Sequence, residues 1–399
     1  MFGVVADPPG RCSDVHSQGG AHGRSRYADL FRRCTGRRYL VPVSPLRRGS
    51  GGQWPGQGRI CLALAADSSR HGHLYRSALV IIAVTADYLQ DPIACLQKAF
   101  PDAEVRSNGT GQILPRDILL SKIVGADAVI AFGRDLIDAE FFDAAGPQLR
   151  IVANTAVGVD NIDLAEARRR GIRVTNTPDP VCEPTADAAW LLMLAAARRV
   201  TEAQELVRSG SWEGFWPTLL VGRKMLRKTL LVVGAGRIGG AIARRSIGWE
   251  MNVLYVANSN KPHLESSPIE ARRVALEDGL AQADFVCLSV PLTEETHHLI
   301  DARRLGLMKD SAVLVNVARG PVVDEAALVR ALEAERIFAA GLDVFEREPA
   351  LQDGLAALPN VVLLPHLGSA TAEDRNWVIE MATASVIAVL RGQVPENLV

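Results

Sequence analysis

Arg319, Glu348 and His366 have side chains that could together hold an anion and move a proton. Each of them follows a largely apolar run that is typical of a buried strand. A histidine can donate or accept a proton near neutral pH, a glutamate can orient its ring, and a planar guanidinium can bind a carboxylate through two hydrogen bonds. A lone histidine is more often structural, but three such groups after strands of one sheet would meet at its carboxyl edge. We therefore predict a catalytic site for a small carboxylate.

The segment LLVVGAGRIGG, which begins at Leu230, adds a cofactor site to that chemistry. Its apolar residues predict a buried parallel strand, Gly234, Gly236 and Gly239 have the spacing G-x-G-x-x-G, and a helix can follow. The first glycine permits a tight turn, the second lets a pyrophosphate approach the backbone, and the third lets the helix pack on the strand. Free N–H groups at the helix N-terminus favour phosphate. We predict a dinucleotide site here; the alternative is a glycine-rich turn in an ordinary α/β domain.

Together these features fit hydride transfer to a 2-oxo acid. His366 would protonate the carbonyl oxygen, and it would take the proton back in the oxidation direction. Glu348 would bond to the other ring nitrogen and favour the imidazolium form, while Arg319 would hold the carboxylate and polarise the carbonyl. A nicotinamide supplies the hydride, so we expect no metal.

The composition argues against several other classes of function. The chain has 399 residues, of which 48% are hydrophobic and 22% are charged, and its formal net charge is -1. A near-neutral chain of this kind is not a general nucleic-acid binder, and no apolar run reaches the ~18 residues of a membrane-spanning helix. The six cysteines form no C-x-x-C pair. We therefore expect a reducing compartment, the cytoplasm, and no structural zinc.

Residues 1–77 are unlike the rest of the chain. They are rich in Gly, Arg and Ser, contain no Lys, and show no persistent helical or strand period. Such a segment cannot bury enough apolar surface to offset its ordering entropy. It could be a disordered extension, an organelle transit peptide, or upstream sequence translated from a wrongly chosen start. We favour the last of these interpretations.

An α/β alternation begins at residue 78 and predicts a small doubly wound, flavodoxin-like domain over residues 78–177. The expected strands are Leu79–Val84, Ala128–Ala131, Leu149–Asn154 and Arg173–Thr175, and the expected helices are Pro92–Phe100 and Ile162–Arg170. Three prolines then break the pattern before a long apolar helix, Thr185–Val200. We place the crossing to a second domain at these prolines.

Residues 178–367 are expected to form a Rossmann domain that carries the glycine loop. Its six expected strands are Leu230–Val233, Val253–Val256, Phe285–Val290, Ala312–Val317, Ala339–Val344 and Val361–Leu364. One more helix, Ala372–Arg391, is expected to return to the first domain, which would then comprise residues 78–177 and 368–399. The predicted fold is therefore α/β, with two doubly wound parallel-sheet domains and a cleft between them.

From residue 78 to residue 399 the chain resembles the D-isomer-specific 2-hydroxyacid dehydrogenases. The matching segments are NTAVGVDNID, TADAAWLLMLAAARR, VGAGRIGG, VPLTEETHHLI, LVNVARGPVVDE, GLDVFEREP and LLPHLGSAT. Within the family it looks most like the glyoxylate/hydroxypyruvate reductases and the 2-ketogluconate reductases. The resemblance implies an NAD(P)-dependent reductase of a small 2-oxo acid that forms the D-2-hydroxy acid. It also implies a homodimer, and the composition gives no reason to expect a nucleic-acid or membrane partner.

Residue by residue, the resemblance places the family's catalytic groups on Arg319, Glu348 and His366. It implies that the backbone N–H groups of Val157 and Gly158, with the Arg319 side chain, meet the substrate carboxylate. The residues expected to bind the cofactor are Gly234, Gly236, Arg237, Ile238, Gly239, Asn258, Ser259, Asn260, Val290, Val317, Ala318, Arg319, Asp343 (at the nicotinamide amide), His366, Gly368 and Ser369.

Three other features have simpler expectations. The helix from Thr185 lies in the region that forms the dimer interface of the family. Trp212, Phe215 and Trp216 could line the rim of the cleft or cover the partner subunit. The pair His297-His298 is expected to be solvated in a polar loop.

The choice between NAD and NADP depends on the loop after the second Rossmann strand. NAD-preferring sites place an acid there for the ribose hydroxyls, and the loop Ala257–Lys261 contains none. Asn258 and Asn260 stand where NADP-preferring relatives carry arginine, and Lys261 is the only cation that remains in the loop. We therefore favour NADP slightly, with NAD as the alternative.

Other functions remain open on the same fold. A 2-ketogluconate reductase or another D-2-hydroxyacid dehydrogenase would use the same residues. A phosphonate dehydrogenase would carry a lysine in the substrate loop, where this chain has Ala156-Val157, so we disfavour it. A non-catalytic, dinucleotide-sensing regulator would retain much of the site. The substrate-loop match favours an enzyme.

Overall fold

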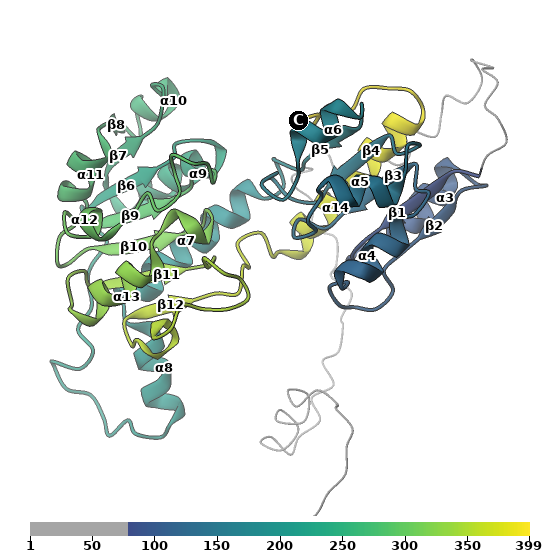
Figure 1. Cartoon of the computed structure of the whole chain (residues 1–399). Coiled ribbons are helices and arrows are strands. Elements are labelled where there is room, and N and C mark those ends of the chain that lie inside the picture. The colour runs from purple at the N-terminus through teal and green to yellow at the C-terminus, as the bar shows by residue number, and fades with distance from the viewer. Residues whose placement is uncertain (1–78) are drawn as a thin grey trace, which may run out of the picture. The chain divides into compact units, whose positions relative to one another are not determined.

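The computed structural model describes residues 79–399, so the extension expected at residues 1–77 lies outside the described part. Within the described residues the strands form two parallel sheets, one of five strands and one of seven, with helices on both faces of each sheet (Figure 1). The prediction of two doubly wound α/β folds is confirmed.

The smaller sheet has the strand order β2-β1-β3-β4-β5, which is the flavodoxin-like order 2-1-3-4-5. Its strands are β1 (Ile81–Val84), β2 (Glu104–Arg106), β3 (Ala128–Ala131), β4 (Ile151–Asn154) and β5 (Arg173–Thr175). Its connecting helices are α3 (Ile93–Ala99), α4 (Arg116–Ile123), α5 (Ala139–Ala145) and α6 (Leu164–Arg169). Apolar patterns missed β2, a three-residue edge strand, and the short helices α4 and α5.

Alternate residues of β1 face the two cores of this domain. Ile82 and Val84 pack with the last helix, α14 (Ala372–Leu390), whereas Ala83 faces the apolar cluster that includes α4 and α5. The last helix therefore covers one face of the small sheet, although the whole large sheet lies between them in the sequence.

The larger sheet has the strand order β12-β11-β10-β9-β6-β7-β8, a Rossmann order with a further strand at the β12 edge. Its strands are β6 (Thr229–Val233), β7 (Asn252–Val256), β8 (Arg272–Arg273), β9 (Phe285–Leu288), β10 (Val313–Asn316), β11 (Ala339–Leu342) and β12 (Val361–Leu363). The sheet thus has one strand more than the six predicted. The missed strand is β8, whose two exposed arginines give no apolar signal.

The connecting segments of the larger sheet are mostly short helices. They are α9 (Arg237–Arg245), η1 (Ser246–Trp249), α10 (Pro262–Glu265), α11 (Leu276–Gln282), α12 (Ala302–Leu305), η2 (Gly320–Val322), α13 (Glu325–Glu333) and η3 (Leu355–Ala357). Residues of α11, α12 and α13 share one apolar core with the sheet, and residues of α9 share the core on the other face.

The helix α7 (Cys182–Ala197) crosses the same face of the large sheet as α9. It packs tightly, because a Cβ on Gly341 of β11 would stand 2.8 Å from the Cβ of Leu192. The helix ends three residues before the predicted Val200. Arg199 adopts a φ of 53° and separates α7 from α8 (Val200–Arg208).

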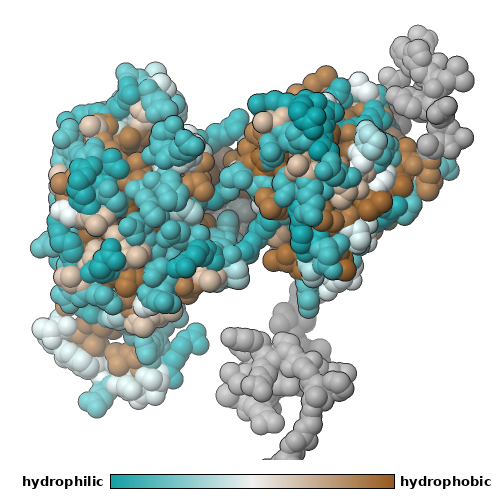
Figure 2. Space-filling view, in the orientation of Figure 1, coloured by the Kyte–Doolittle hydropathy of each residue, from teal (hydrophilic) through white to brown (hydrophobic). Residues whose placement is uncertain are grey.

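No helix among residues 79–399 is long and apolar enough to cross a membrane. Figure 2 shows a visible face on which hydrophilic areas alternate with smaller apolar ones. This side of the described part therefore exposes both polar and apolar residues.

Candidate active site

The glycine turn between β6 and α9 has the geometry that a pyrophosphate requires. Gly234 has a φ of 95°, and a Cβ there would stand 2.7 Å from the carbonyl oxygen of Ser289. A Cβ on Gly239 would stand 2.0 Å from the carbonyl oxygen of Gly234, so a glycine is needed for α9 to lie this close to the strand. A Cβ on Gly236 would meet nothing within 4 Å. Open space therefore lies beside the backbone at this position.

The helix α9 begins at that open space, and no side chain caps its first turn. Its first N–H groups, on Arg237, Ile238 and Gly239, have no acceptors within the helix and add to the positive end of its dipole. The cradle formed by these groups and the glycine turn fits the pyrophosphate of a dinucleotide. A nicotinamide dinucleotide held there would supply a hydride.

Residues that follow the neighbouring strand, β9, border this turn. Cγ1 of Val290, which follows β9, would lie 2.8 Å from a Cβ on Gly234, and the hydroxyl of Ser289 donates to the carbonyl oxygen of Gly234 at 2.8 Å. Val317 and Ala318, which follow β10, are almost fully buried. Ser289 was not predicted as a site residue. A single serine after an apolar run carries no sequence signal for this contact.

The loop after β7 is where we expect the adenosine ribose. Its predicted residues Asn258, Ser259 and Asn260 are exposed. Arg273 of β8 donates into this loop, to the carbonyl oxygens of Ala257 and Asn258 and to Oδ1 of Asn260, at 3.0, 3.1 and 3.0 Å. Lys261 is the only cation within the loop itself, as predicted, and Arg273 adds a second one from β8, twelve positions later in the sequence.

His366 and Glu348 come from segments that follow β12 and β11, and they form a hydrogen-bonded pair. Nδ1 of His366 lies 3.0 Å from Oε2 and 3.2 Å from Oε1 of Glu348. Burial alone would raise the pKa of Glu348, but the hydrogen bond and charge of His366 and the N–H of Phe345 together hold that pKa below its ordinary 4.5. The glutamate is thus a charged acceptor that orients the ring. The His366 side chain is 44% exposed, so a substrate can reach it.

Asp343 holds the loop that carries His366. Its side chain is buried, and its two carboxylate oxygens accept hydrogen bonds from the N–H groups of Leu367 and Gly368 at 2.7 and 2.8 Å. The N–H of His366 donates to the carbonyl oxygen of Asp343 at 2.8 Å. These bonds support a φ of 56° at His366, a left-handed conformation that is uncommon for a residue with a Cβ. Burial raises the pKa of Asp343, and the two N–H groups oppose that rise.

Gly368 and Ser369 continue the same loop. A Cβ on Gly368 would stand 2.8 Å from Oδ2 of Asp343, so glycine lets the backbone N–H approach the carboxylate. Ser369 is half-exposed at the next position. The resemblance assigned Asp343 to the nicotinamide amide, and the hydrogen bonds show a second task that sequence patterns did not indicate.

Arg319 follows β10, and Asn316 shapes its turn. The amide of Asn316 accepts the N–H of Ala318 at 3.0 Å and donates to the carbonyl oxygen of Arg319 at 2.9 Å. Nε of Arg319 lies 3.1 and 3.3 Å from the two carboxylate oxygens of Asp160. Asp160 belongs to a matching segment, NTAVGVDNID, but no pattern assigned it a contact. The ion pair became visible only in the folded chain.

Val157 and Gly158 lie in the turn after β4, and hydrogen bonds fix their peptide planes. The carbonyl oxygens of Ala156 and Val157 accept bonds at 3.0 and 2.8 Å from the segment that follows β5. Because C=O and N–H point in opposite directions in a trans peptide, the N–H groups of Val157 and Gly158 point away from that segment. A Cβ on Gly158 would stand 1.9 Å from Nη2 of Arg319. The guanidinium of Arg319 therefore lies directly beside the backbone of this turn.

The strands β10, β11 and β12 are neighbours in the sheet, so the groups that follow them gather at one edge. Arg319 can hold a carboxylate there, His366 can exchange a proton with a carbonyl or hydroxyl oxygen, and Glu348 orients the ring. In residues 79–399 no three side chains of metal-binding type gather at one point.

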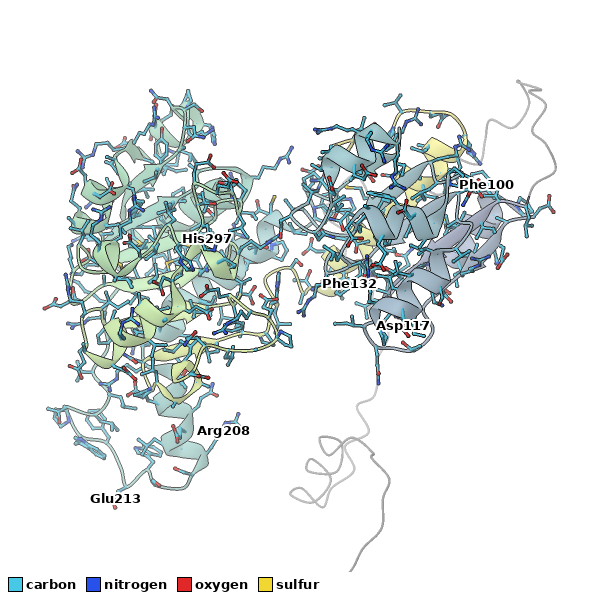
Figure 3. The ribbon with its side chains drawn as sticks, in the orientation of Figure 1. Phe100, Asp117, Phe132, Arg208, Glu213 and His297 are labelled. Carbon is cyan, nitrogen blue, oxygen red and sulfur yellow. The ribbon has the colours of Figure 1, made fainter. Side chains whose placement is uncertain are left out.

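His297 is exposed, as expected for a solvated pair, whereas His298 is half-buried. Figure 3 shows His297 in the domain of the large sheet. Its ring stacks on that of His298 with centroids 4.1 Å apart, and Nε2 of His298 lies 2.9 Å from Oε1 of Glu346. Because Glu346 lies two residues before Glu348, His298 helps to hold the segment that carries Glu348.

Known proteins show the same organisation. The family profile described as "D-isomer specific 2-hydroxyacid dehydrogenase, NAD binding domain" matches residues 190–368. A glyoxylate reductase of Thermococcus kodakarensis is 50% identical over 290 residues, which are 72% of this chain and 86% of that protein. The crystal structure of the TT0316 protein from Thermus thermophilus is 41% identical with a TM-score of 0.74, and the match covers 80% of this chain and all of that chain.

A second solved structure is informative about the cofactor of a relative. The NADPH-dependent glyoxylate/hydroxypyruvate reductase of Sinorhizobium meliloti, solved with NADP and malonate, is 31% identical with a TM-score of 0.70, and the match covers 81% of this chain and 97% of that chain. Together with the glycine turn, these similarities show a nicotinamide-dependent oxidoreductase that acts on CH–OH groups. The chain belongs to the D-isomer-specific 2-hydroxyacid dehydrogenase family.

Proposed function

We propose that this protein reduces glyoxylate, hydroxypyruvate or a similarly small 2-oxo acid to the 2-hydroxy acid, with D configuration where the product is chiral. The observation that carries the proposal is the pair His366–Glu348, at 3.0 Å, on the sheet edge that also carries Arg319. The identity to a glyoxylate reductase, 50% over 290 residues, supports the same substrate class.

The site residues have three roles in the proposed reaction: they bind the carboxylate, transfer the proton and hold the histidine ring. The substrate carboxylate binds to Arg319 and to the N–H groups of Val157 and Gly158. This binding orients the 2-oxo acid so that its carbonyl carbon faces the nicotinamide. The Nε2–H of His366 donates its proton to the carbonyl oxygen as that oxygen gains charge. Glu348 stays ionised and holds the ring through Nδ1, which leaves Nε2 for the substrate oxygen. In the oxidation direction His366 takes the proton from the hydroxyl.

Both nicotinamide cofactors should work, with NADPH preferred. The loop Ala257–Lys261 carries no acid that would repel a 2′-phosphate, and its exposed asparagines can donate neutral hydrogen bonds. Neutral donors are weaker than charge-assisted ones by roughly a factor of two. We therefore propose a lead of about one order of magnitude for NADPH, or about 1.4 kcal/mol.

The proposed domain division is residues 78–177 with 368–399 for the substrate-binding domain, and 178–367 for the cofactor-binding domain. Two contacts of the chain end support it. The N–H of Val399 donates to the carbonyl oxygen of Val174 at 2.9 Å, and Ile379 of α14 lies in the core of the small sheet.

We propose that the enzyme is a cytoplasmic homodimer. Trp212, Phe215 and Trp216 are 53%, 86% and 43% exposed on the segment after α8. Figure 3 shows that this segment, marked by Arg208 and Glu213, extends away from the strands of the large sheet. Three exposed aromatic side chains in five residues suit a partner surface. Light scattering after size-exclusion chromatography measures the mass of the particle and so tests the dimer. A variant in which Trp212, Phe215 and Trp216 are all changed to serine should dissociate at higher protein concentration than the wild type.

A spectrophotometric panel tests the activity. Glyoxylate, hydroxypyruvate, pyruvate and 2-ketogluconate would each be offered with NADPH and with NADH, and kcat/KM would be measured for each pair. We expect the highest values with glyoxylate and hydroxypyruvate. A clear preference for 2-ketogluconate would assign the other reductase activity, and no turnover of any 2-oxo acid would contradict the proposal.

A further inference from the structure

Arg273 occupies an unusual place beside the proposed cofactor site. It lies on β8, the edge strand of the large sheet, and Tyr255 of β7 is its partner in the register of the two strands. Its guanidinium crosses to the loop Ala257–Lys261 and donates three hydrogen bonds there, from Nε, Nη1 and Nη2. The three acceptors are two carbonyl oxygens and one side-chain oxygen, none of which carries a charge.

A guanidinium has five N–H donors, so three bonds leave two donors of Arg273 to be used. No carboxylate is among the partners described above, and the side chain is exposed. A positive charge with donors to spare, held over a ribose loop, suits a phosphate group. A planar guanidinium held at three points is also pre-organised, so little side-chain entropy is lost when a further anion binds.

Further hydrogen bonds hold the C-terminal part of the loop Ala257–Lys261 in place. The N–H of Lys261 donates to the hydroxyl of Tyr255 at 2.9 Å, and Nζ of Lys261 lies 3.2 Å from Oγ of Ser259. Glu265 of α10 accepts a hydrogen bond from the same tyrosine hydroxyl. The loop is thus held at its end by Tyr255 and along its length by Arg273.

We propose that Arg273 is a specificity-determining residue that binds the 2′-phosphate of NADPH and gives this chain its preference for the phosphorylated cofactor. The inference rests on the proposed function, because it assigns a role in that same site. It differs from the sequence-based expectation, in which the asparagines and Lys261 alone would face the phosphate.

The test compares two neighbouring arginines in the full-length protein. Arg273→Gln removes the charge beside the loop and keeps a polar side chain. Arg272→Gln is the matched control, since Arg272 has the same charge and exposure but donates to Gln282 instead of the loop. Dissociation constants for NADPH and NADH would be measured by cofactor fluorescence without any 2-oxo acid, and melting temperatures would show that both variants fold.

We expect Arg273→Gln to weaken NADPH binding about tenfold or more and to change NADH binding no more than about twofold, since one charge-assisted phosphate contact is lost. Arg272→Gln should change neither constant more than about twofold. Arg273→Lys, which keeps the charge and loses the fork, should fall between the wild type and Arg273→Gln for NADPH.

Two results would overturn the inference. If Arg273→Gln lost the same affinity for NADPH and for NADH, Arg273 would only support the loop. If its affinity for NADPH were unchanged, the 2′-phosphate would lie elsewhere. Neither result depends on turnover. Failure of the proposed reductase activity would appear separately, as wild-type protein that binds NADPH but reduces no 2-oxo acid.

Discussion

Glu348 contacts one nitrogen of His366 with both of its carboxylate oxygens, at 3.0 and 3.2 Å. The two residues are eighteen positions apart and follow adjacent strands of the sheet. Because Nδ1 is engaged, Nε2 is the ring nitrogen that can exchange a proton with a substrate. The pair therefore sets which nitrogen acts in the proposed reaction, and it gives rise to the first two predictions.

The change His366→Ala should lower kcat for glyoxylate by about 10²–10⁴-fold, since that is the typical contribution of a positioned acid–base group. The dissociation constant for NADPH should change little, because the glycine turn and the ribose loop are intact. Steady-state kinetics and cofactor fluorescence check the two parts. A kcat within a few-fold of the wild type would show that another group donates the proton.

The carboxylate of Glu348 makes the free energy of unfolding of the wild-type protein depend on pH. Its pKa in the folded state lies below the ordinary 4.5, so the wild type gains stability from its ionised form above that value. The gain is lost as the pH falls through the lowered pKa. The free energy of unfolding of the wild type, measured against that of Glu348→Gln, should therefore show an advantage at pH 7 that shrinks below about pH 4.5.

Asp343→Asn should lower kcat more than it weakens NADPH binding. The wild-type carboxylate accepts two N–H groups, from Leu367 and Gly368, whereas an asparagine can accept only one and must turn its own NH₂ toward the other. The loop would then hold His366 less well in its left-handed conformation. Equal losses in kcat and in cofactor affinity would instead favour a role limited to the nicotinamide amide.

Sequence patterns predicted the features that depend on local spacing. The glycine turn, the long apolar strands and the three candidate catalytic residues all occur in short motifs, and a Rossmann sheet brings the ends of its strands together. Arg319, Glu348 and His366 could be named for that reason before any contact was known.

The contacts that were missed join segments far apart in the sequence. Asp160 meets Arg319 across 159 positions, and Arg273 reaches the ribose loop from a two-residue strand with no apolar residue. Asp343 was assigned from the resemblance, but its hydrogen bonds to the His366 loop depend on where the chain returns after β12. Such pairings follow from tertiary packing, which residue spacing does not record.

Two glycines of the same turn should behave differently when each is changed to alanine. A methyl group at Gly236 meets nothing within 4 Å, so Gly236→Ala should keep its melting temperature and lose cofactor affinity, because the methyl group occupies the space for the pyrophosphate. A methyl group at Gly239 meets the carbonyl oxygen of Gly234 at 2.0 Å, so Gly239→Ala should lower the melting temperature as well. Calorimetry and cofactor binding measured on both variants check the contrast, and a destabilised Gly236→Ala would contradict it.

The last prediction concerns the geometry of Arg319. Its Nε faces Asp160, its Nη1 donates to the carbonyl oxygen of Ala318 at 2.9 Å, and its Nη2 lies nearest to Gly158. A lysine keeps the charge but cannot face three directions at once. Arg319→Lys should therefore raise KM for glyoxylate and lower kcat nearly as much as Arg319→Ala. The control is Arg227→Lys, at an exposed arginine that pairs with Glu250 on the far end of β6, and it should leave both parameters unchanged. If Arg319→Lys retained normal kinetics, a point charge would suffice at this position and the substrate carboxylate would not depend on the guanidinium fork.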